Sequence, residues 1–448
     1  MKTPRRMLIV ALVVLVTAVP AGALRLSCAW NSCSGVAGAS TARVPFCSLP
    51  ADIKTLLAAG FYPGRSPDVL GVGADRTTVV SNAEGGPSVP WPSVSSGPST
   101  RVPIVMSGVG LEPDAENPDD MQLDQVAPTI ADVIGFHRPN PDVRAGTSLF
   151  AVASGDAPRL VLEVAWKGVG SDDLGSAFPA TPYLQQLFRS GIGTLNGSTG
   201  SLPVDPAATL TTIGTGGPPE QHGVTGASIR NRKGQVVPAW GPGAPTSVIA
   251  TLPDDYDVGM RGAPMIGLVA TSGSDRGIIG KDWYPGGDDD PVAVMSGLDG
   301  QLRALDKLLS HDGFGADRIP DILALVATGA PSALDAQLRT AVRLAMRAAG
   351  GSLLVVVAGT GSVAVPSGSS IVGADAVIGR VEVGSNVVGD LVNASVAGGL
   401  FLDQAVMTKE GVTGQVAQQA LGALEDSGGR PLMADTFQGF AVSFGRYC

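Results

Sequence analysis

The segment from residue 202 to 226 contains several hydroxyl side chains, carboxylates and one imidazole, the groups that a nucleophilic mechanism uses. This segment carries Asp205, a group of threonines that begins at Thr209, and a Pro-x-x-His-Gly turn around His222. A threonine hydroxyl becomes a nucleophile when a neighbouring base or metal activates it. At the start of a helix the same hydroxyl caps backbone N–H groups, so the segment permits a catalytic and a structural interpretation.

Two acidic clusters elsewhere have the ligand chemistry of a hard cation. Asp172 and Asp173 follow Lys167-Gly168, and Asp288 begins a run of three aspartates. Carboxylate oxygens of this kind bind calcium or another divalent ion. Acids in the first turn of a helix also stabilise that helix, and an acidic run between Gly287 and Pro291 is typical of a solvated loop. Asp172, Asp173 and Asp288 are therefore weak metal candidates.

The elements that would position these side chains alternate between short apolar strands and longer amphipathic helices. Strands are predicted at 160–166, 265–270, 321–327 and 353–358, and helices at 181–188, 298–309 and 332–349. Apolar strands joined by crossover helices form a parallel sheet that is covered on both faces. We predict an α/β fold with three α/β/α layers around a mainly parallel central sheet. Residues 367–396, rich in Val, Ile and Gly, are predicted to form antiparallel ribbons.

The order of helix, loop and strands resembles the alkaline phosphatase superfamily, specifically its type I phosphodiesterase and nucleotide pyrophosphatase branch. In that branch a Thr-Pro-x-Leu helix precedes a nucleophile loop and a Thr-Gly-x-x-Pro-x-x-His-Gly segment, which residues 215–223 resemble with one register adjustment. Residues 160–168 and 354–361 look like two strands whose ends carry metal ligands in those enzymes. The resemblance spans most of residues 159–365 and implies an alkaline phosphatase-like core.

A second resemblance is out of order along the chain. Residues 101–108 and 123–135 are similar to the family's closing strand and its Asp-Val-Ala-Pro-Thr-Leu helix, which usually lie near the C-terminus. This order implies a circular permutation, which is tolerated when the original termini lie close together. We therefore expect one alkaline phosphatase-like domain over 51–448. In it, 51–150 resembles the family's C-terminal part, 159–365 its core, and 366–448 is a C-terminal extension.

The resemblance implies two zinc ions held by Asp and His and a Thr or Ser nucleophile, and these residues are replaced here. Lys167 stands where the first strand should end in a metal-binding Asp, and Asp205 or Pro206 stands near the nucleophile position. Gly359-Thr360-Gly361 replaces Ser-Asp-His-Gly. We expect a degenerate cleft, with Lys167, Asp205 and Thr209 as its candidate residues and no zinc or other cofactor.

Two further observations concern the same cleft. The chain has 3 histidines in all, and a structural role is expected for each of them: His137, His222 and His311. Lys167 is expected to replace the metal by its charge and to form an ion pair with Asp205, because a buried carboxylate left alone is costly. The alternative is that Lys167 extends to solvent from the strand end.

Composition excludes some partners. With 30 Lys and Arg against 40 Asp and Glu, the net charge of −10 disfavours nucleic acid as a partner. Aromatic residues make up 5% of the chain, which also disfavours platforms for stacked bases or sugars.

The first residues have the pattern of a secretory signal peptide, which we place at 1–23. Lys2, Arg5 and Arg6 precede an apolar run, and Ala21-Gly22-Ala23 is typical of a cleavage site. An uncleaved membrane anchor is the alternative, although the run is short for a span. We expect a secreted or cell-envelope protein with no membrane span after cleavage.

The 4 cysteines lie near the ends of the chain, three of them in the segment 24–50. In an exported protein they favour two disulfides over a metal site. The spacing suits a Cys28–Cys33 pair and leaves Cys47 for Cys448, although three connectivities remain open. A Cys47–Cys448 bridge would tie the two ends of a permuted domain together.

The leading hypothesis is a secreted, catalytically inactive member of the superfamily, with a binding or structural role toward an unknown envelope or extracellular partner. The alternative is a metal-dependent phosphodiesterase, phosphatase or sulfatase whose ligands include Asp172, Asp173, Asp205 and Asp288. An unrelated envelope interaction module is a third hypothesis.

Overall fold

A seven-stranded sheet lies at the centre of the computed structural model. It describes residues 46–75, 77–81, 88–111, 118, 120–149, 156–175, 180–281, 283–285, 290–387 and 389–444. The strand order is β10-β9-β11-β5-β12-β4-β6, and β4 alone runs antiparallel to its neighbours within this sheet. The strands are β4 (Arg101–Gly108), β5 (Leu160–Trp166), β6 (Ile192–Ser198), β9 (Ile266–Ala270), β10 (Val292–Val294), β11 (Asp321–Ala327) and β12 (Leu353–Gly359).

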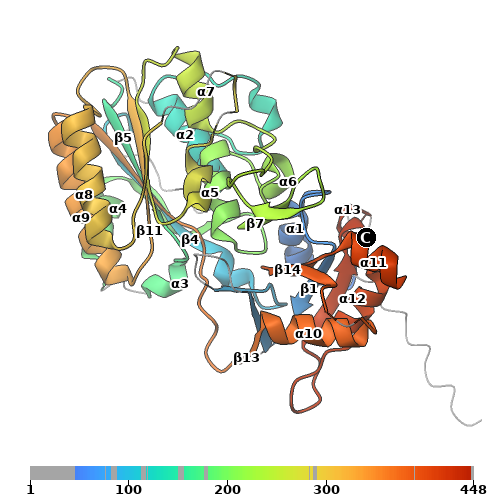
Figure 1. Cartoon of the computed structure of the whole chain (residues 1–448). Helices are drawn as coiled ribbons and strands as arrows, with labels where there is room; N and C mark the ends of the chain where they lie inside the picture. The colour runs from blue at the N-terminus through green and yellow to red at the C-terminus, as the bar shows by residue number, and fades with distance from the viewer. Residues whose placement is uncertain are drawn as a thin grey trace, which may run out of the picture. The chain divides into compact units, whose positions relative to one another are not determined.

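Helices cover both faces of this sheet, as Figure 1 shows. One apolar core joins the sheet to α2 (Val126–Val133), α5 (Pro206–Thr215) and α7 (Leu252–Gly259). The other core joins it to α4 (Pro182–Ser190), α8 (Leu298–Lys307) and α9 (Pro331–Ala348). Because successive side chains of a strand point to opposite faces, β5 contributes to both cores. The predicted three-layer α/β/α fold with a mainly parallel sheet is confirmed.

A second set of strands is built from both ends of the described chain. A four-stranded antiparallel sheet has the order β14-β15-β1-β16, and a three-stranded sheet has the order β13-β2-β3. Their strands are β1 (Val69–Gly73), β2 (Thr77–Ser81), β3 (Val89–Pro90), β13 (Ser370–Gly373), β14 (Val392–Val396), β15 (Gly399–Leu402) and β16 (Met433–Gln438). Since β1 pairs directly with β16, the early and late parts of the chain are joined in one sheet.

The remaining elements are short or pack around these sheets. A small hairpin pairs β7 (Ser228–Arg230) with β8 (Val236–Pro238). The other helices are α1 (Ala51–Ala59), α3 (Ser171–Leu174), α6 (Pro219–His222), α10 (Ala374–Gly384), α11 (Gln404–Glu410), α12 (Gly414–Gly422) and α13 (Gly439–Phe444).

The ribbons predicted for residues 367–396 are largely wrong. The segment contains the 11-residue helix α10, and its first strand, β13, pairs with β2 in parallel. Ala374, Val377 and Val381 are the buried side of this helix. Their spacing of three and four residues is the helical signal that the high content of Val and Gly concealed.

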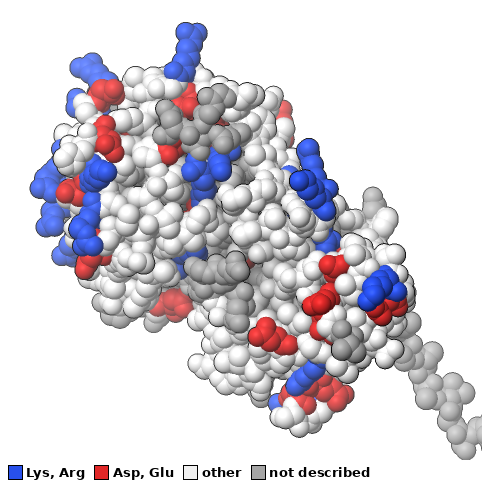
Figure 2. All heavy atoms as spheres, viewed as in Figure 1, with Lys and Arg blue, Asp and Glu red and all other residues white. Residues whose placement is uncertain are grey.

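The outer helices carry much of the positive charge on the face shown in Figure 2, where Lys and Arg gather over α8 and α9. The exposed basic residues of these helices include Arg303, Lys307, Arg339 and Arg343. Such positions are the solvent side of amphipathic helices. Among the described residues, no helix is both long enough and apolar enough to cross a membrane.

Candidate functional site

The carboxyl ends of three neighbouring parallel strands meet directly after Trp166. In the sheet register, Trp166 lies beside Ala327 of β11 and Gly359 of β12. Lys167 follows, and its backbone N–H donates to the carbonyl of Ala327 over 2.8 Å. Gly168 then takes a positive φ of 77°, a conformation that favours glycine and turns the chain away from the sheet. Ligands of open α/β sheets bind at such strand ends, so this edge is the expected place of the site.

Lys167 does not reach solvent at this edge, since its side chain is only 5% exposed. Its Nζ donates to Oδ1 of Asp275 at 2.6 Å and to the hydroxyls of Thr271 and Ser272, each at 3.2 Å. These partners follow β9, the strand beyond β11. Three acceptors surround the ammonium group, so it is buried with its charge compensated.

Asp275 is fully buried and is bonded by more than the lysine. Its Oδ2 accepts from the backbone N–H groups of Thr271 and Ser272, at 2.8 and 2.9 Å. It also accepts from the Thr271 hydroxyl. Ser272 and Asp275 form a capping box, the Ser/Thr-x-x-acid pattern that begins a helical turn. This pattern is a sequence signal for a helix start near Asp275, but it does not indicate which cation the carboxylate pairs with.

The predicted ion pair between Lys167 and Asp205 is wrong. Asp205 caps α5 instead, since its Oδ1 accepts from the Ala207 N–H at 2.9 Å and its Oδ2 from the Ala227 N–H at 3.1 Å. Burial raises the pKa of Asp205, and these N–H groups and the charge of Lys167 act in the opposite direction. Lys167 therefore affects Asp205 only at a distance, because the capping role already uses both carboxylate oxygens.

The hydroxyl of Thr209 has a local helical role. It donates to the carbonyls of Asp205 and Pro206, both at 3.2 Å, and the residue is completely buried. A threonine bonded in this way to the preceding turn is a common feature inside helices. With both of these hydrogen bonds inside its own helix and the residue fully buried, this hydroxyl is not placed to act as a nucleophile.

The histidines lie away from Lys167. His222 is buried, with Nε2 at 3.1 Å from the Thr212 hydroxyl and Nδ1 accepting from the Val224 N–H. Burial and the nearby charge of Arg65 lower the pKa of His222 to about 3, so the ring is neutral. His137 is exposed next to Arg138, which bonds the last turn of α5. His311 is exposed beyond the end of α8, before β11 begins.

The donors at the strand ends do not fit a two-zinc site. Zinc requires imidazole, thiolate or carboxylate ligands, and the group at the end of β5 is an ammonium held in an ion pair. Across the described part of the chain, no three His, Cys, Asp or Glu side chains form a group that could hold a metal ion. No step of a metal-assisted reaction can be derived from these residues.

Asp172 and Asp173 lie at one side of a crevice near the same edge. Asp173 accepts from the Gly170 N–H at 2.7 Å and from the Ser362 hydroxyl at 3.1 Å. Asp172 pairs with Arg101 at 3.2 Å, and both side chains are about half exposed. The crevice has a volume of about 540 Å³. It is also lined by Leu202 and Val204, from the loop before α5.

Of the other predicted residues, four lie outside the described part of the chain and Asp205 lines a different cavity. Asp288, Cys28, Cys33 and Cys448 are not among the described residues, so the proposed metal role and the disulfide pairings stay predictions. Asp205 lines a smaller cavity of about 320 Å³, together with Asp375 and Asn393.

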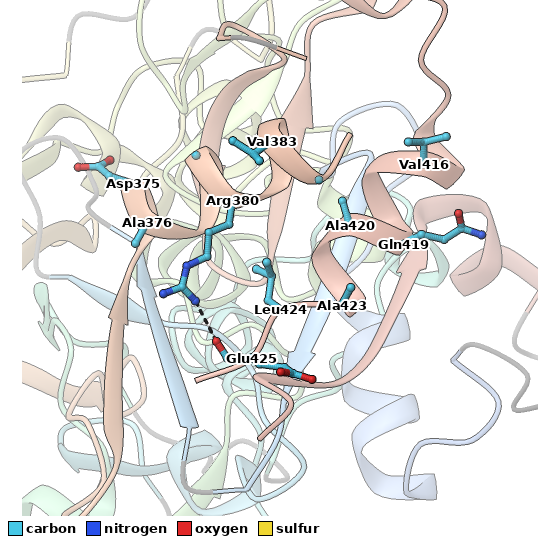
Figure 3. Close-up of a pocket in the computed structure, with 12 residues that line it drawn as sticks. Asp375, Ala376, Arg380, Val383, Val416, Gln419, Ala420, Ala423, Leu424 and Glu425 are labelled. Carbon is cyan, nitrogen blue, oxygen red and sulfur yellow. Dashed lines mark hydrogen bonds between the residues drawn. The ribbon is translucent and has the colours of Figure 1, made fainter. Parts of the chain in front are cut away.

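A shallow groove between α10 and α12 lies apart from the strand ends. Figure 3 shows its small apolar floor of Ala420, Ala423 and Leu424, with Arg380 bonded to the carbonyl of Glu425. Its polar groups do not converge on one point. We therefore place the candidate functional site at the crevice beside Asp173 rather than in this groove.

A match to a known protein family agrees with the resemblance seen in the sequence. Residues 164–260 match the family described as type I phosphodiesterase / nucleotide pyrophosphatase, and this segment includes Lys167, Asp205 and His222. A crystal structure of a mutant of the alkaline phosphatase PafA is similar at 11% identity and a TM-score of 0.43, covering 60% of this chain and 77% of that chain. A comparison with curated proteins found no match.

The family match and the motif around His222 show that residues 164–260 are similar to the type I phosphodiesterase and nucleotide pyrophosphatase branch of the alkaline phosphatase superfamily.

Proposed function

We propose that this chain is a non-catalytic, extracytoplasmic domain of the alkaline phosphatase type, whose crevice serves binding or structure in the cell envelope. The observation that carries the proposal is the buried ion pair between Lys167 and Asp275. It occupies the strand end at which the family resemblance expects a metal-binding aspartate. A cation fixed at this place repels a divalent ion instead of binding it.

The surroundings of the ion pair support the same proposal. The carboxylate of Asp205 is committed to capping α5, and the Thr209 hydroxyl is committed to carbonyls of its own helix. Neither is left to act as ligand or nucleophile. The extracytoplasmic location rests on the sequence of the first 23 residues, whose charged start and apolar run are typical of an exported protein.

Metal analysis together with an activity assay tests this proposal. The purified mature protein is expected to contain less than one zinc per chain and to leave bis-p-nitrophenyl phosphate intact. Turnover that a chelator abolishes would contradict the proposal and favour the metal-dependent hydrolase. In that case Asp205→Asn and Asp173→Asn would separate the candidate ligands, because only a true ligand would be needed for turnover.

A further inference from the structure

The crevice beside Asp173 is built from segments far apart in the sequence. Its walls come from the chain around β3, from the 3₁₀ turn before β4, from α3, and from the loop that follows β12. Its volume of about 540 Å³ is within the range of sites for small organic ligands. It therefore has the size and the position of a binding site at the end of an α/β sheet.

The polar lining of this crevice consists largely of hydroxyl groups. The hydroxyl of Ser93 lies 3.2 Å from that of Ser95 and 3.3 Å from that of Ser96. Ser362, also in the lining, donates to Asp173. Hydroxyl groups donate and accept with equal ease, so this lining is matched to a ligand that does both.

The charge of the crevice argues against an anionic ligand. Among the described residues, its lining includes two carboxylates, Asp172 and Asp173, and no Lys or Arg. The nearby guanidinium of Arg101 is already paired with Asp172. Sites for phosphate esters use arginine or lysine as partners of the anion. A phosphodiester would meet net repulsion here.

A cationic ligand would find only one carboxylate without a cation, because Asp172 is paired with Arg101. Asp173 accepts two hydrogen bonds from the protein and can accept further ones from a ligand. The remaining surface of the crevice is apolar and includes Trp91, Val204 and Pro98.

We propose that this crevice binds an uncharged oligosaccharide. Sugar hydroxyls would exchange hydrogen bonds with the serines and with Asp173, and the apolar wall would receive the C–H faces of the rings. The inference rests on the proposed function, because a catalytic phosphodiesterase would need this edge of the sheet for an anionic ester.

Ligand-observed saturation-transfer NMR on the mature protein tests the inference. The probes are maltotriose, cellotriose and triacetylchitotriose, with dimethyl phosphate and spermine as the anionic and cationic comparisons. Ala364→Trp introduces a large ring at an exposed residue that lines the crevice. Ala376→Trp makes the same change at an exposed residue of the α10–α12 groove in Figure 3 and is the matched control.

The expected result is binding of at least one trisaccharide by wild type and Ala376→Trp, and binding weaker by about tenfold or more in Ala364→Trp. Equal binding by the two variants, or no binding of any trisaccharide, would overturn the inference. If no probe binds, the oligosaccharide inference is refuted but the proposed function is not, because zinc content and hydrolysis test that function separately. Preferred binding of dimethyl phosphate would contradict both.

Discussion

Glu163 in the middle of β5 and Lys167 directly after its end are equally buried, at 4% and 5% exposed, but have opposite surroundings. Lys167 has an aspartate and two hydroxyls around its ammonium group. Glu163 lies within an apolar face of the sheet, and its Oε1 has no hydrogen-bond partner among the described residues. Burial raises the pKa of Glu163 to about 8. Burial alone therefore does not decide whether an ionisable group stays charged; its partners do.

This difference explains why the position after β5 is a charged site and the middle of β5 is not. A group at a strand end is reached by the loops of neighbouring strands, and here the loop after β9 supplies Thr271, Ser272 and Asp275. Glu163 lies beside Ala324 of β11 and Val356 of β12, which offer no polar side chain. A carboxyl group there remains protonated through the neutral range and acts as part of the core.

The largest expected effect comes from breaking the charged pair. Lys167→Met leaves Asp275 buried without its cation, which should lower the free energy of unfolding by about 3–5 kcal/mol. Urea unfolding measures this loss. Lys281→Met removes an exposed lysine and should change the free energy of unfolding by no more than about 0.5 kcal/mol. If Lys167→Met lowers the free energy of unfolding as little as this control does, the pair does not stabilise the fold as a buried ion pair.

Glu163, the uncompensated group in this comparison, should make the free energy of unfolding depend on pH. In the folded protein the pKa of Glu163 is about 8, above the ordinary value of 4.5. The stability that the protonated carboxyl group contributes is therefore complete below pH 4.5 and is lost as the pH rises through 8. Between pH ~6 and pH ~7.5 this should lower the free energy of unfolding by about 2 kcal/mol.

Glu163→Gln removes the titration without changing the shape of the side chain. The difference in unfolding free energy between wild type and this variant should shift by that amount between the two pH values, with the variant gaining as pH rises. Parallel curves for the two proteins would show that Glu163 ionises equally in the folded and unfolded states.

The smallest effect is expected at the exposed pair of Arg101 and Asp172, whose side chains are 45% and 57% exposed. Solvent screens such pairs, so Asp172→Asn should change the free energy of unfolding by about 0–1 kcal/mol. Thermal unfolding at low and high salt measures this change. A loss comparable to that of Lys167→Met would remove the distinction between buried and exposed pairs at this edge.

The fold was readily predicted because the central strands are continuous apolar runs and the crossover helices have clear periodicity. Residues 160–166 and 321–327 become β5 and β11 with their predicted boundaries. Helix α10 was missed because Val and Gly favour other structures, and only Ala374, Val377 and Val381 revealed the helical spacing.

The charge partner of Lys167 could not be obtained from position along the sequence. Asp275 is 108 residues away and lies in the loop after β9, a strand that is two places from β5 in the sheet. Asp205 was the nearer candidate in the family resemblance, but its place before Pro206 makes it a helix cap. Pairing across a parallel sheet depends on strand order, which local patterns do not specify.

The most direct test of the central claim is the melting temperature of the mature protein with zinc and with a chelator. A metal that binds only the folded state raises stability in proportion to the logarithm of its concentration. With the Lys167–Asp275 pair in place of a metal, the melting temperature should be the same in both conditions. A melting temperature that falls with the chelator, and is restored by about two equivalents of zinc per chain, would contradict the account.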